Sequence, residues 1–218
     1  MKENRNIARG EFALEVQNFN KKIQVGARKN KIGKDWISID KYDKSSFIDF
    51  NYDLHDLPYA EGEIDCIVCN AVLEHVEEPQ LAIFEMYRVL KPGGQIWVEV
   101  PFTQPFHSDP QDYWRVTVQG MRRWMSDFNE RTCGTIPNLA REAEKYFDAF
   151  HRNLGISLEN VSSLRTRVTD YVAKQVDSGV DFMSIYSGVY FWGEKPSDRS
   201  MALEKARYYS WLKEHLFH

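Results

Sequence analysis

The fold is decided by two apolar runs and the segment that joins them, Ile64-Asp65-Cys66-Ile67-Val68-Cys69-Asn70 and Gln95-Ile96-Trp97-Val98-Glu99-Val100. The first run is short and continuous, which is typical of a strand buried on both faces. Glu77-Glu78-Pro79 then predicts the start of a helix, because proline is tolerated in the first turn and acidic residues complement the helix dipole there. The second run resumes as a strand.

The joining segment carries the signals of one amphipathic helix. Arg88 and Lys91 place positive charge in its expected last turn, and Gly93-Gly94 supplies the left-handed geometry needed to leave it. The helix and its flanking strands therefore predict a right-handed βαβ unit. Four apolar residues recur at helical spacing and predict the face that packs on the sheet: Leu81, Phe84, Tyr87 and Leu90.

Length and composition indicate an ordinary globular protein. The chain has 218 residues, of which 43% are hydrophobic and 28% charged, so it is long enough for one well-buried domain. Its net charge of −4 argues against a general nucleic-acid partner. We expect neither a secretory signal nor membrane insertion, because no apolar run approaches the length of a membrane span. The expected location is the cytoplasm.

The three cysteines predict no metal site. Cys66 and Cys69 form a C-x-x-C string, but residues three apart on a strand point to opposite faces and do not readily share a metal or a disulfide. Unpaired cysteines are commonly buried, and no second C-x-x-C completes a zinc site. We therefore expect both cysteines to be packing residues in a reducing compartment.

Two shorter strands precede this unit and place candidate ligands at one edge of the sheet. The segments 22–27 and 36–40 are predicted as strands that end in Gly26 and Asp40. In open α/β sheets ligands bind beyond the carboxyl ends of the strands. A carboxylate at the end of the second strand suits the two hydroxyls of a ribose, so Asp40 is the leading candidate for a cofactor ligand.

Taken together, these segments resemble the class I S-adenosylmethionine-dependent methyltransferase superfamily, of the methyltransferase type 11 kind. The resemblance covers residues 22–128 and the last strand. It implies S-adenosylmethionine as cofactor and a Rossmann-like, doubly wound α/β sheet that is mostly parallel with an antiparallel last strand. The match implies that Asp53 binds the adenine amino group, that the Leu54 N–H meets the ring, and that Asn70 faces the methionine end. The implied cofactor residues are Val25, Gly26, Ala27, Asp40, Lys41, Asp53, Leu54 and Asn70.

The glycine-rich loop of this superfamily is reduced here. Only Gly26 and Gly33 are present, and the interval from Ala27 to Lys34 is too short for a full crossover helix. A pyrophosphate needs several glycines for close backbone approach, so a nicotinamide enzyme is disfavoured. S-Adenosylmethionine has no phosphate, and backbone N–H groups from Gly26 to Arg28 would suit its carboxylate. The reduced loop also leaves open a catalytically degenerate fold used for binding or scaffolding.

A proline-rich loop after the fifth expected strand holds the candidate catalytic residues. Prolines at 101, 105 and 110 exclude a continuous helix, and loops at this edge often carry chemistry. His107 is the candidate general base, with Asp109 or Asp112 orienting it. The alternative is a purely structural loop in which Asp112 pairs with Arg115. A divalent metal on His107 and the two aspartates is conceivable, but loop spacing does not establish it, and no metal ligand is predicted. Glu74-His75 is interpreted as helix-start structure.

The remaining chain predicts helices around one last strand. A helix near 120–125 leads to a strand near 131–135, and apolar stripes in 139–154 and 161–172 predict a helical insertion at about 137–178. The last strand is expected at Ser184–Trp192. We interpret residues 1–196 as one methyltransferase domain and 197–218 as a helical tail. Its apolar face is expected to dock on the domain or to form a homodimer contact: Tyr208, Trp211, Leu212 and His215.

These features together predict a methyltransferase that acts on a small molecule. The expected reaction is O-methylation of a sugar or another small hydroxylated acceptor, either a free molecule or a glycan, with His107 as the base. The sequence names neither the acceptor nor the methylated atom.

Overall fold

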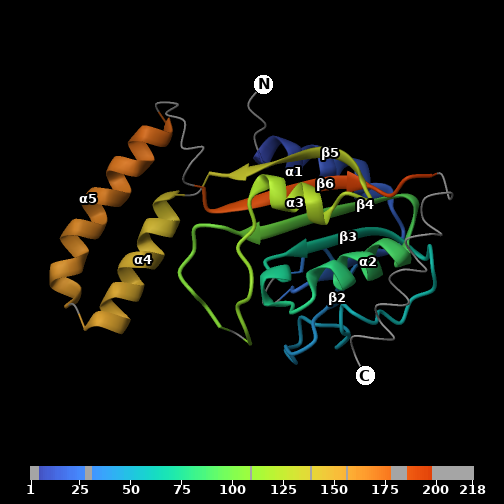
Figure 1. Ribbon diagram of the computed structural model, residues 1–218, viewed down its shortest axis with the longest axis horizontal. Helices are drawn as coiled ribbons and strands as arrows, with labels where there is room; N and C mark the ends of the chain where they lie inside the picture. Colours follow the sequence, from blue (N-terminus) through green and yellow to red (C-terminus); the bar gives the residue numbers. More distant parts are fainter. Residues whose placement is uncertain are drawn as a thin grey trace.

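The computed structural model describes residues 5–27, 31–108, 110–137, 139–155, 157–177 and 186–197. A six-stranded sheet lies at its centre (Figure 1). Its spatial order is β2 (Trp36–Ile39), β1 (Lys22–Val25), β3 (Ile64–Asn70), β4 (Leu90–Pro101), β6 (Gly188–Glu194) and β5 (Asn129–Ile136). The first four strands are parallel, whereas β6 is antiparallel to both of its neighbours. The predicted fold class, a mostly parallel sheet with an antiparallel last strand, is confirmed.

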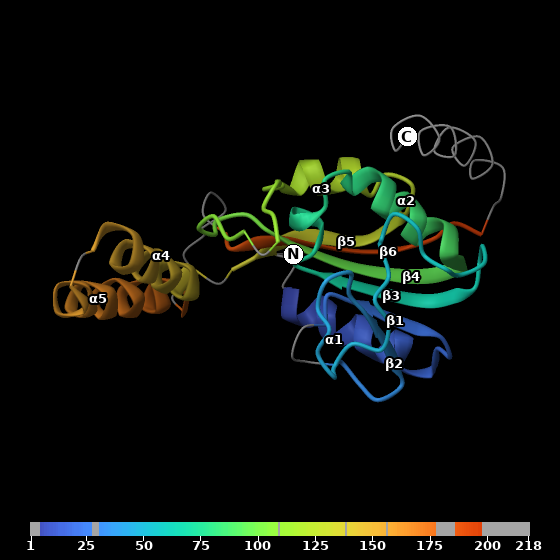
Figure 2. The same cartoon turned by 90° about the horizontal axis from the view of Figure 1, so that it is seen from below.

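Helices cover both faces of this sheet (Figure 2). On one face lies α1 (Arg5–Glu15), and on the other lie α2 (Pro79–Val89) and α3 (Val118–Trp124). Alternate residues of β3 and β4 enter the two separate cores: Val68 and Trp97 pack with Phe12 of α1, while Ile67 and Val98 belong to the larger core beneath α2. This double burial is why the two strands read as continuous apolar runs.

The cysteine prediction holds in detail. Cys66 and Cys69 are both fully buried, and they belong to the two cores on opposite faces of β3. Burial raises the pKa of both thiols well above its usual range, so they stay protonated packing groups.

The end of α2 differs from the prediction. The helix begins at Pro79 as expected but ends at Val89, and β4 already starts at Leu90, which pairs with Ile64. Lys91 therefore lies in the strand rather than in the last helical turn. Gly93 has the expected positive φ of 77°, but it lies within β4.

The buried face of α2 also differs, because the helix packs more broadly than a single stripe. Phe84 and Tyr87 are only half-buried, whereas Ile83, Glu85 and Met86 beside them are buried. The core positions of the helix are Leu81, Ala82, Ile83, Glu85, Met86 and Val89.

Two long helices, α4 (Leu139–Leu154) and α5 (Leu158–Asp177), lie between β5 and β6 in the chain. Figure 1 shows this pair beyond the carboxyl ends of β3 and β4, apart from the helices that cover the sheet. Its limits agree with the expected insertion, while the division into domains stays a prediction. The tail after residue 197, and Ser184 and Ile185 of the expected last strand, lie outside the described residues. No helix in the described ranges is long and apolar enough to cross a membrane.

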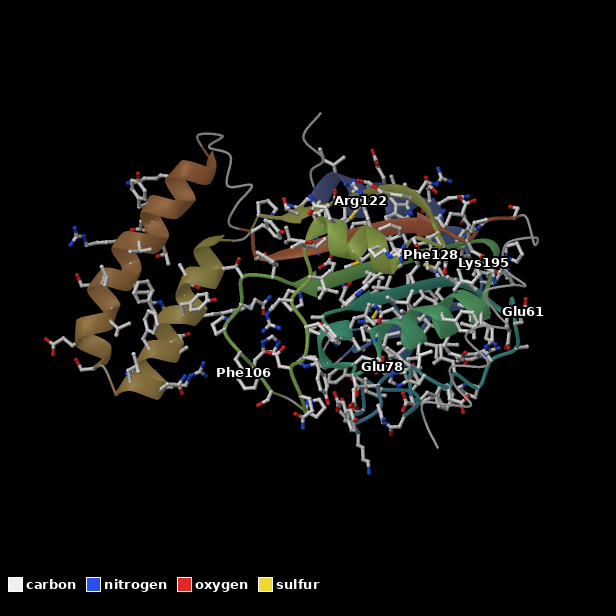
Figure 3. All side chains as sticks on the ribbon, in the orientation of Figure 1. Glu61, Glu78, Phe106, Arg122, Phe128 and Lys195 are labelled. Carbon is white, nitrogen blue, oxygen red and sulfur yellow. The ribbon has the colours of Figure 1, made fainter. Side chains whose placement is uncertain are left out.

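A buried lysine ties the last strand to the end of α2. Lys195 is 5% exposed, and its Nζ donates hydrogen bonds of 2.8 Å to the carbonyls of Tyr87 and Leu90. Figure 3 shows Lys195 at the end of the sheet opposite Phe106, far from the candidate catalytic loop. The ammonium therefore satisfies carbonyls that the end of a helix leaves without partners.

We expect Lys195→Met to lower the free energy of unfolding by about 1–3 kcal/mol, because the buried carbonyls of Tyr87 and Leu90 would lose their hydrogen-bond donor. Urea unfolding followed by circular dichroism measures this change. The matched control is Lys91→Met, whose side chain is 43% exposed and pairs with Asp65, and for which a surface ion pair predicts a change below about 1 kcal/mol. Equal losses in the two variants would contradict the capping role of Lys195.

Gly26 is required where β1 ends. Its φ is +69°, and an added Cβ would lie 2.3 Å from Cγ2 of Val72. We expect Gly26→Ala to destabilise the protein by at least about 1–2 kcal/mol, since the left-handed conformation alone costs that much in other residues. The control is Gly10→Ala in α1, where a Cβ meets nothing within 4 Å and helix propensity predicts a gain of about 0.5–1 kcal/mol. If Gly26→Ala left the thermal unfolding temperature unchanged, position 26 would not require glycine.

Candidate functional site

A pocket of about 780 Å³ lies at the carboxyl ends of β1, β2 and β3. This is the edge of the sheet where the sequence places the cofactor. Most of the predicted cofactor residues line it, together with aromatic side chains that the sequence analysis did not single out: Val25, Gly26, Asp40, Lys41, Tyr42, Tyr52, Asp53, Leu54 and Tyr113.

Asp40 directly follows β2 and is held in place by a turn. Its Oδ1 accepts hydrogen bonds of 2.8 and 2.9 Å from the backbone N–H groups of Tyr42 and Asp43. The side chain of Asn51 donates to the Asp40 carbonyl at 2.9 Å. The turn therefore fixes this carboxylate on the wall of the pocket, and no crossover helix is needed to position it.

Asp53 lies on the same pocket wall and remains ionised. Its carboxylate accepts from the N–H of His55 at 3.0 Å and contacts Nζ of Lys41 at 2.6 Å. Partial burial opposes ionisation, but these two donors hold the pKa of Asp53 below its usual range. Lys41, predicted as a cofactor contact, is thus also the ion-pair partner of the predicted adenine ligand.

The methionine end of the predicted site needs one correction. The N–H of Gly26 donates to the Ile39 carbonyl at 2.9 Å, so it is not available for a carboxylate. Arg28 lies outside the described residues, and Ala27 is buried beside the pocket. Asn70 lines a neighbouring pocket, and its Oδ1 is buried without a hydrogen-bond partner in the described part of the chain.

This second pocket, of about 630 Å³, lies beside the first. The two pockets share Gly26, Ala71 and His75 in their walls. Ala71 has a φ of 51°, which is uncommon for a residue other than glycine and marks a constrained turn after β3. The second pocket extends from there to the candidate loop and to α4: Glu74, Glu99, Gln104, Phe106, His107, Lys145, Arg152 and Ser187.

The loop that follows β4 is tied to the short helix η2 (Leu73–His75). The N–H of Tyr113 donates to the Glu74 carbonyl at 2.7 Å, and the indole N–H of Trp114 donates to the Val76 carbonyl at 2.9 Å. Nδ1 of His75 hydrogen-bonds to the carbonyl of Gln111. These contacts bring residues more than thirty positions apart in sequence into one site.

Within the loop, Asp112 holds the backbone and does not orient the His107 ring. It accepts from the His107 N–H at 2.8 Å and pairs with Arg115 at 2.7 Å, and the Arg115 guanidinium lowers the pKa of Asp112 to about 2. The His107 Nδ1 lies 3.6 Å from Asp112 but 3.0 Å from the Pro105 carbonyl. The Asp112–Arg115 ion pair, which was predicted for a loop with a purely structural role, is therefore present. Asp109 lies outside the described residues.

The carboxylate that faces His107 is Glu74, which was predicted from the sequence as part of a helix start and not as a site residue. Oε1 of Glu74 lies 3.9 Å from Nε2 of His107 and 3.6 Å from Nε2 of His75. Glu74 is the main cause of a raised pKa at His107. Glu74-His75 does form a helical turn, as predicted, but both side chains also line the second pocket. The available signal was an acid adjacent to a histidine at the carboxyl end of a strand.

Sequence comparison matches part of the chain to known proteins. Residues 29–98 match the model of the "Methyltransferase domain" family. The chain is 45% identical over 49 residues to an uncharacterized 37.1 kDa protein in transposon TN4556 of Streptomyces fradiae, and 43% identical over 49 residues to the ubiquinone/menaquinone biosynthesis C-methyltransferase UbiE of Haemophilus ducreyi. Each match covers 22% of this chain but only 14% and 18% of the relative.

Solved structures share the fold at low sequence identity. A candidate methyltransferase from Bacillus halodurans C-125 aligns with a TM-score of 0.55 and 13% identity, over 88% of this chain and all of the other. The [4+2]-cyclase SpnF aligns with a TM-score of 0.54 and 18% identity, over 90% and 86% of the two chains. A Haemonchus contortus phosphoethanolamine N-methyltransferase, solved with S-adenosylhomocysteine, gives 0.51 and 11% over 86% and 52%.

The parallel sheet, the pocket at its carboxyl edge and the matched stretch thus agree with one another. They confirm the resemblance seen in the sequence and support its implied cofactor and enzyme class. Residues 29–98 of this chain match the methyltransferase domain model, and the chain has the fold of the class I S-adenosylmethionine-dependent methyltransferases.

Proposed function

We propose that this protein transfers the methyl group of S-adenosylmethionine to a hydroxyl of a sugar or another small hydroxylated acceptor. The cofactor occupies the first pocket, with its ribose on Asp40 and its adenine amino group on Asp53. Leu54 donates its N–H to the ring, and Asn70 lies at the methionine end. This arrangement follows the residues that the sequence resemblance assigns and the walls on which they lie.

The observation that carries the proposal is the shared wall of the two pockets. Methyl transfer is an in-line displacement that requires the nucleophile, the methyl carbon and the sulfonium sulfur to be aligned and close. A donor in the first pocket and an acceptor in the second meet where Gly26, Ala71 and His75 line both. Two adjoining pockets at the carboxyl edge of a parallel sheet suit such a transfer.

The second pocket has the polar lining that a hydroxylated acceptor requires. Gln104 and Ser187 line it with polar side chains, and Lys145 and Arg152 come from α4, so α4 forms part of the acceptor wall. His107 accepts the acceptor proton through Nε2, because its Nδ1 hydrogen-bonds to the Pro105 carbonyl. The reducing cytoplasm, where the three buried cysteines remain thiols, is the proposed location.

A second candidate is a protein of this fold that transfers no methyl group. The [4+2]-cyclase among the structural neighbours favours it, because a cyclisation is not a methyl transfer. The reduced glycine loop also favours a protein that transfers no methyl group. Calorimetry separates the two candidates: an affinity for S-adenosylmethionine weaker than about 1 mM, the low end of specific binding, would contradict the methyltransferase.

We expect Asp40→Ala to weaken S-adenosylmethionine binding by about 1–3 kcal/mol, since it removes the acceptors of the ribose hydroxyls. Calorimetric titration measures the affinity directly. The control is Asp43→Asn, which changes a neighbouring acid on the same wall but removes no proposed cofactor contact. If Asp40→Ala folds and binds as the wild type does, Asp40 does not bind the ribose.

We expect His107→Ala to lower turnover by about 10²- to 10⁴-fold while leaving the affinity for S-adenosylmethionine unchanged, because a base acts on the acceptor alone. The assay follows S-adenosylhomocysteine released over a panel of sugars and small alcohols. His151→Ala is the matched control, since this histidine of α4 lines neither pocket. Unchanged turnover in His107→Ala would make His107 a structural residue.

A further inference from the structure

We propose that Glu74, His75 and His107 bind a divalent transition-metal ion of the zinc type in the second pocket. One ligand atom from each residue lies within 4.8 Å of the other two. The three side chains come from η2 and from the loop after β4, and all three line that pocket. The sequence analysis predicted no metal ligand, so this proposal revises it.

The first supporting observation is the state of the Glu74 carboxylate. The side chain is 0% exposed, and neither of its oxygens makes a hydrogen bond with the described part of the chain. A buried carboxylate without hydrogen-bond partners is unfavourable, and buried charges in proteins are therefore paired or coordinate metals. The nearest cationic partners are the two imidazoles, and both lie beyond hydrogen-bond distance.

The second observation is the orientation of both histidine rings. Nδ1 of His75 hydrogen-bonds to the Gln111 carbonyl, and Nδ1 of His107 lies 3.0 Å from the Pro105 carbonyl. A carbonyl oxygen only accepts, so each of these hydrogen bonds places the proton on Nδ1 and leaves the lone pair on Nε2. Nη2 of Arg115 also lies near Nδ1 of His107, but at 3.4 Å it is farther away than the Pro105 carbonyl. Both Nε2 atoms face the same Glu74 oxygen. Metal-binding histidines are ordinarily held in this way, with the second ring nitrogen donating to a backbone carbonyl or carboxylate.

The spacing of the ligand atoms suits an ion between them. Zinc binds imidazole nitrogen and carboxylate oxygen at about 2.0–2.2 Å in tetrahedral geometry, so two of its ligand atoms lie about 3.3–3.6 Å apart. Oε1 of Glu74 is 3.6 Å from Nε2 of His75 and 3.9 Å from Nε2 of His107. These separations are too long for hydrogen bonds. The Glu74–His75 pair already has the spacing of a tetrahedral site, and His107 must approach the other two ligands for all three to bind one ion.

The chemistry of the ligands selects the class of ion. Two imidazoles and one carboxylate suit zinc and similar transition metals, whereas magnesium and calcium prefer oxygen ligands. Zinc sites with three protein ligands leave a fourth position open for a water or a substrate. Here that position would face the second pocket, which the same three residues line.

The consequence for catalysis rests on the proposed function, but the binding of the ion does not. A hydroxyl coordinated to the ion loses its proton more readily, so the ion would ionise the acceptor. His107 does not act as ligand and as free base through the same Nε2. In the metal-bound protein His107 is therefore a ligand and not the base: the ion would lower the pKa of the acceptor hydroxyl, and the proton would leave to solvent water.

The test measures metal binding directly. The 218-residue chain is stripped with a chelator and titrated with Zn²⁺ by calorimetry, and with Co²⁺ by visible absorption. We expect one equivalent of each ion. Glu74→Gln, His75→Ala and His107→Ala should each weaken Zn²⁺ binding by at least about 10- to 100-fold, the loss seen when only an outer partner of a ligand is removed. His151→Ala, a histidine outside the cluster, should bind as the wild type does.

Absence of stoichiometric Zn²⁺ binding, or equal binding by the wild type and all three folded cluster variants, would overturn the proposal. Circular dichroism establishes folding, and Glu74→Gln preserves the shape of the buried side chain. S-Adenosylmethionine affinity is measured on the same metal-free samples. Zinc binding without cofactor binding would refute only the proposed function, and cofactor binding without zinc would refute only the metal site.

Discussion

The parallel pairing of β3 with β4 is the constraint on which the rest of the structure depends. Both strands are buried on both faces, so helices must cover the sheet on each side, and the chain must cross over it between parallel strands. Parallel strands also end at one edge. The residues that follow β1, β2 and β3, among them Gly26, Asp40 and Glu74, are consequently gathered there, although they are far apart in sequence. The two pockets are a result of this topology, which α4 and the loop after β4 complete.

The same edge explains how polar groups become buried without unfolding the domain. The loop after β4 folds back over η2, and the backbone carbonyl of Glu74 accepts from the N–H groups of Tyr113 and Trp114. This closure covers the Glu74 carboxylate and presents two imidazoles to it. Asp112 and Arg115 brace the loop from within. The loop thus has a structural and a chemical part, carried by different residues.

Much of the fold was predictable because its signals are local. The continuous apolar run of β3, the Glu78-Pro79 start of α2 and the positive φ of Gly93 each reflect the physics of a few neighbouring residues. The end of α2 was predicted wrongly for a related reason. Helix propensity extends past Val89, but Leu90 pairs with Ile64 in the sheet, and this pairing ends the helix. A local sequence pattern does not indicate which strand a residue will pair with.

The sequence by itself determined the sheet, the acids that follow its strands and the resemblance to methyltransferases. The reason is that strand burial and turn formation depend on the types of residues that are neighbours in the chain. Only the tertiary structure decided which groups meet. In the folded chain the N–H of Gly26 donates to the Ile39 carbonyl, and Asp112 pairs with Arg115. Glu74 lies against two histidines, one of which is thirty-three residues away in the sequence. Distances between side chains on different elements depend on how those elements pack, and packing is a property of the whole chain.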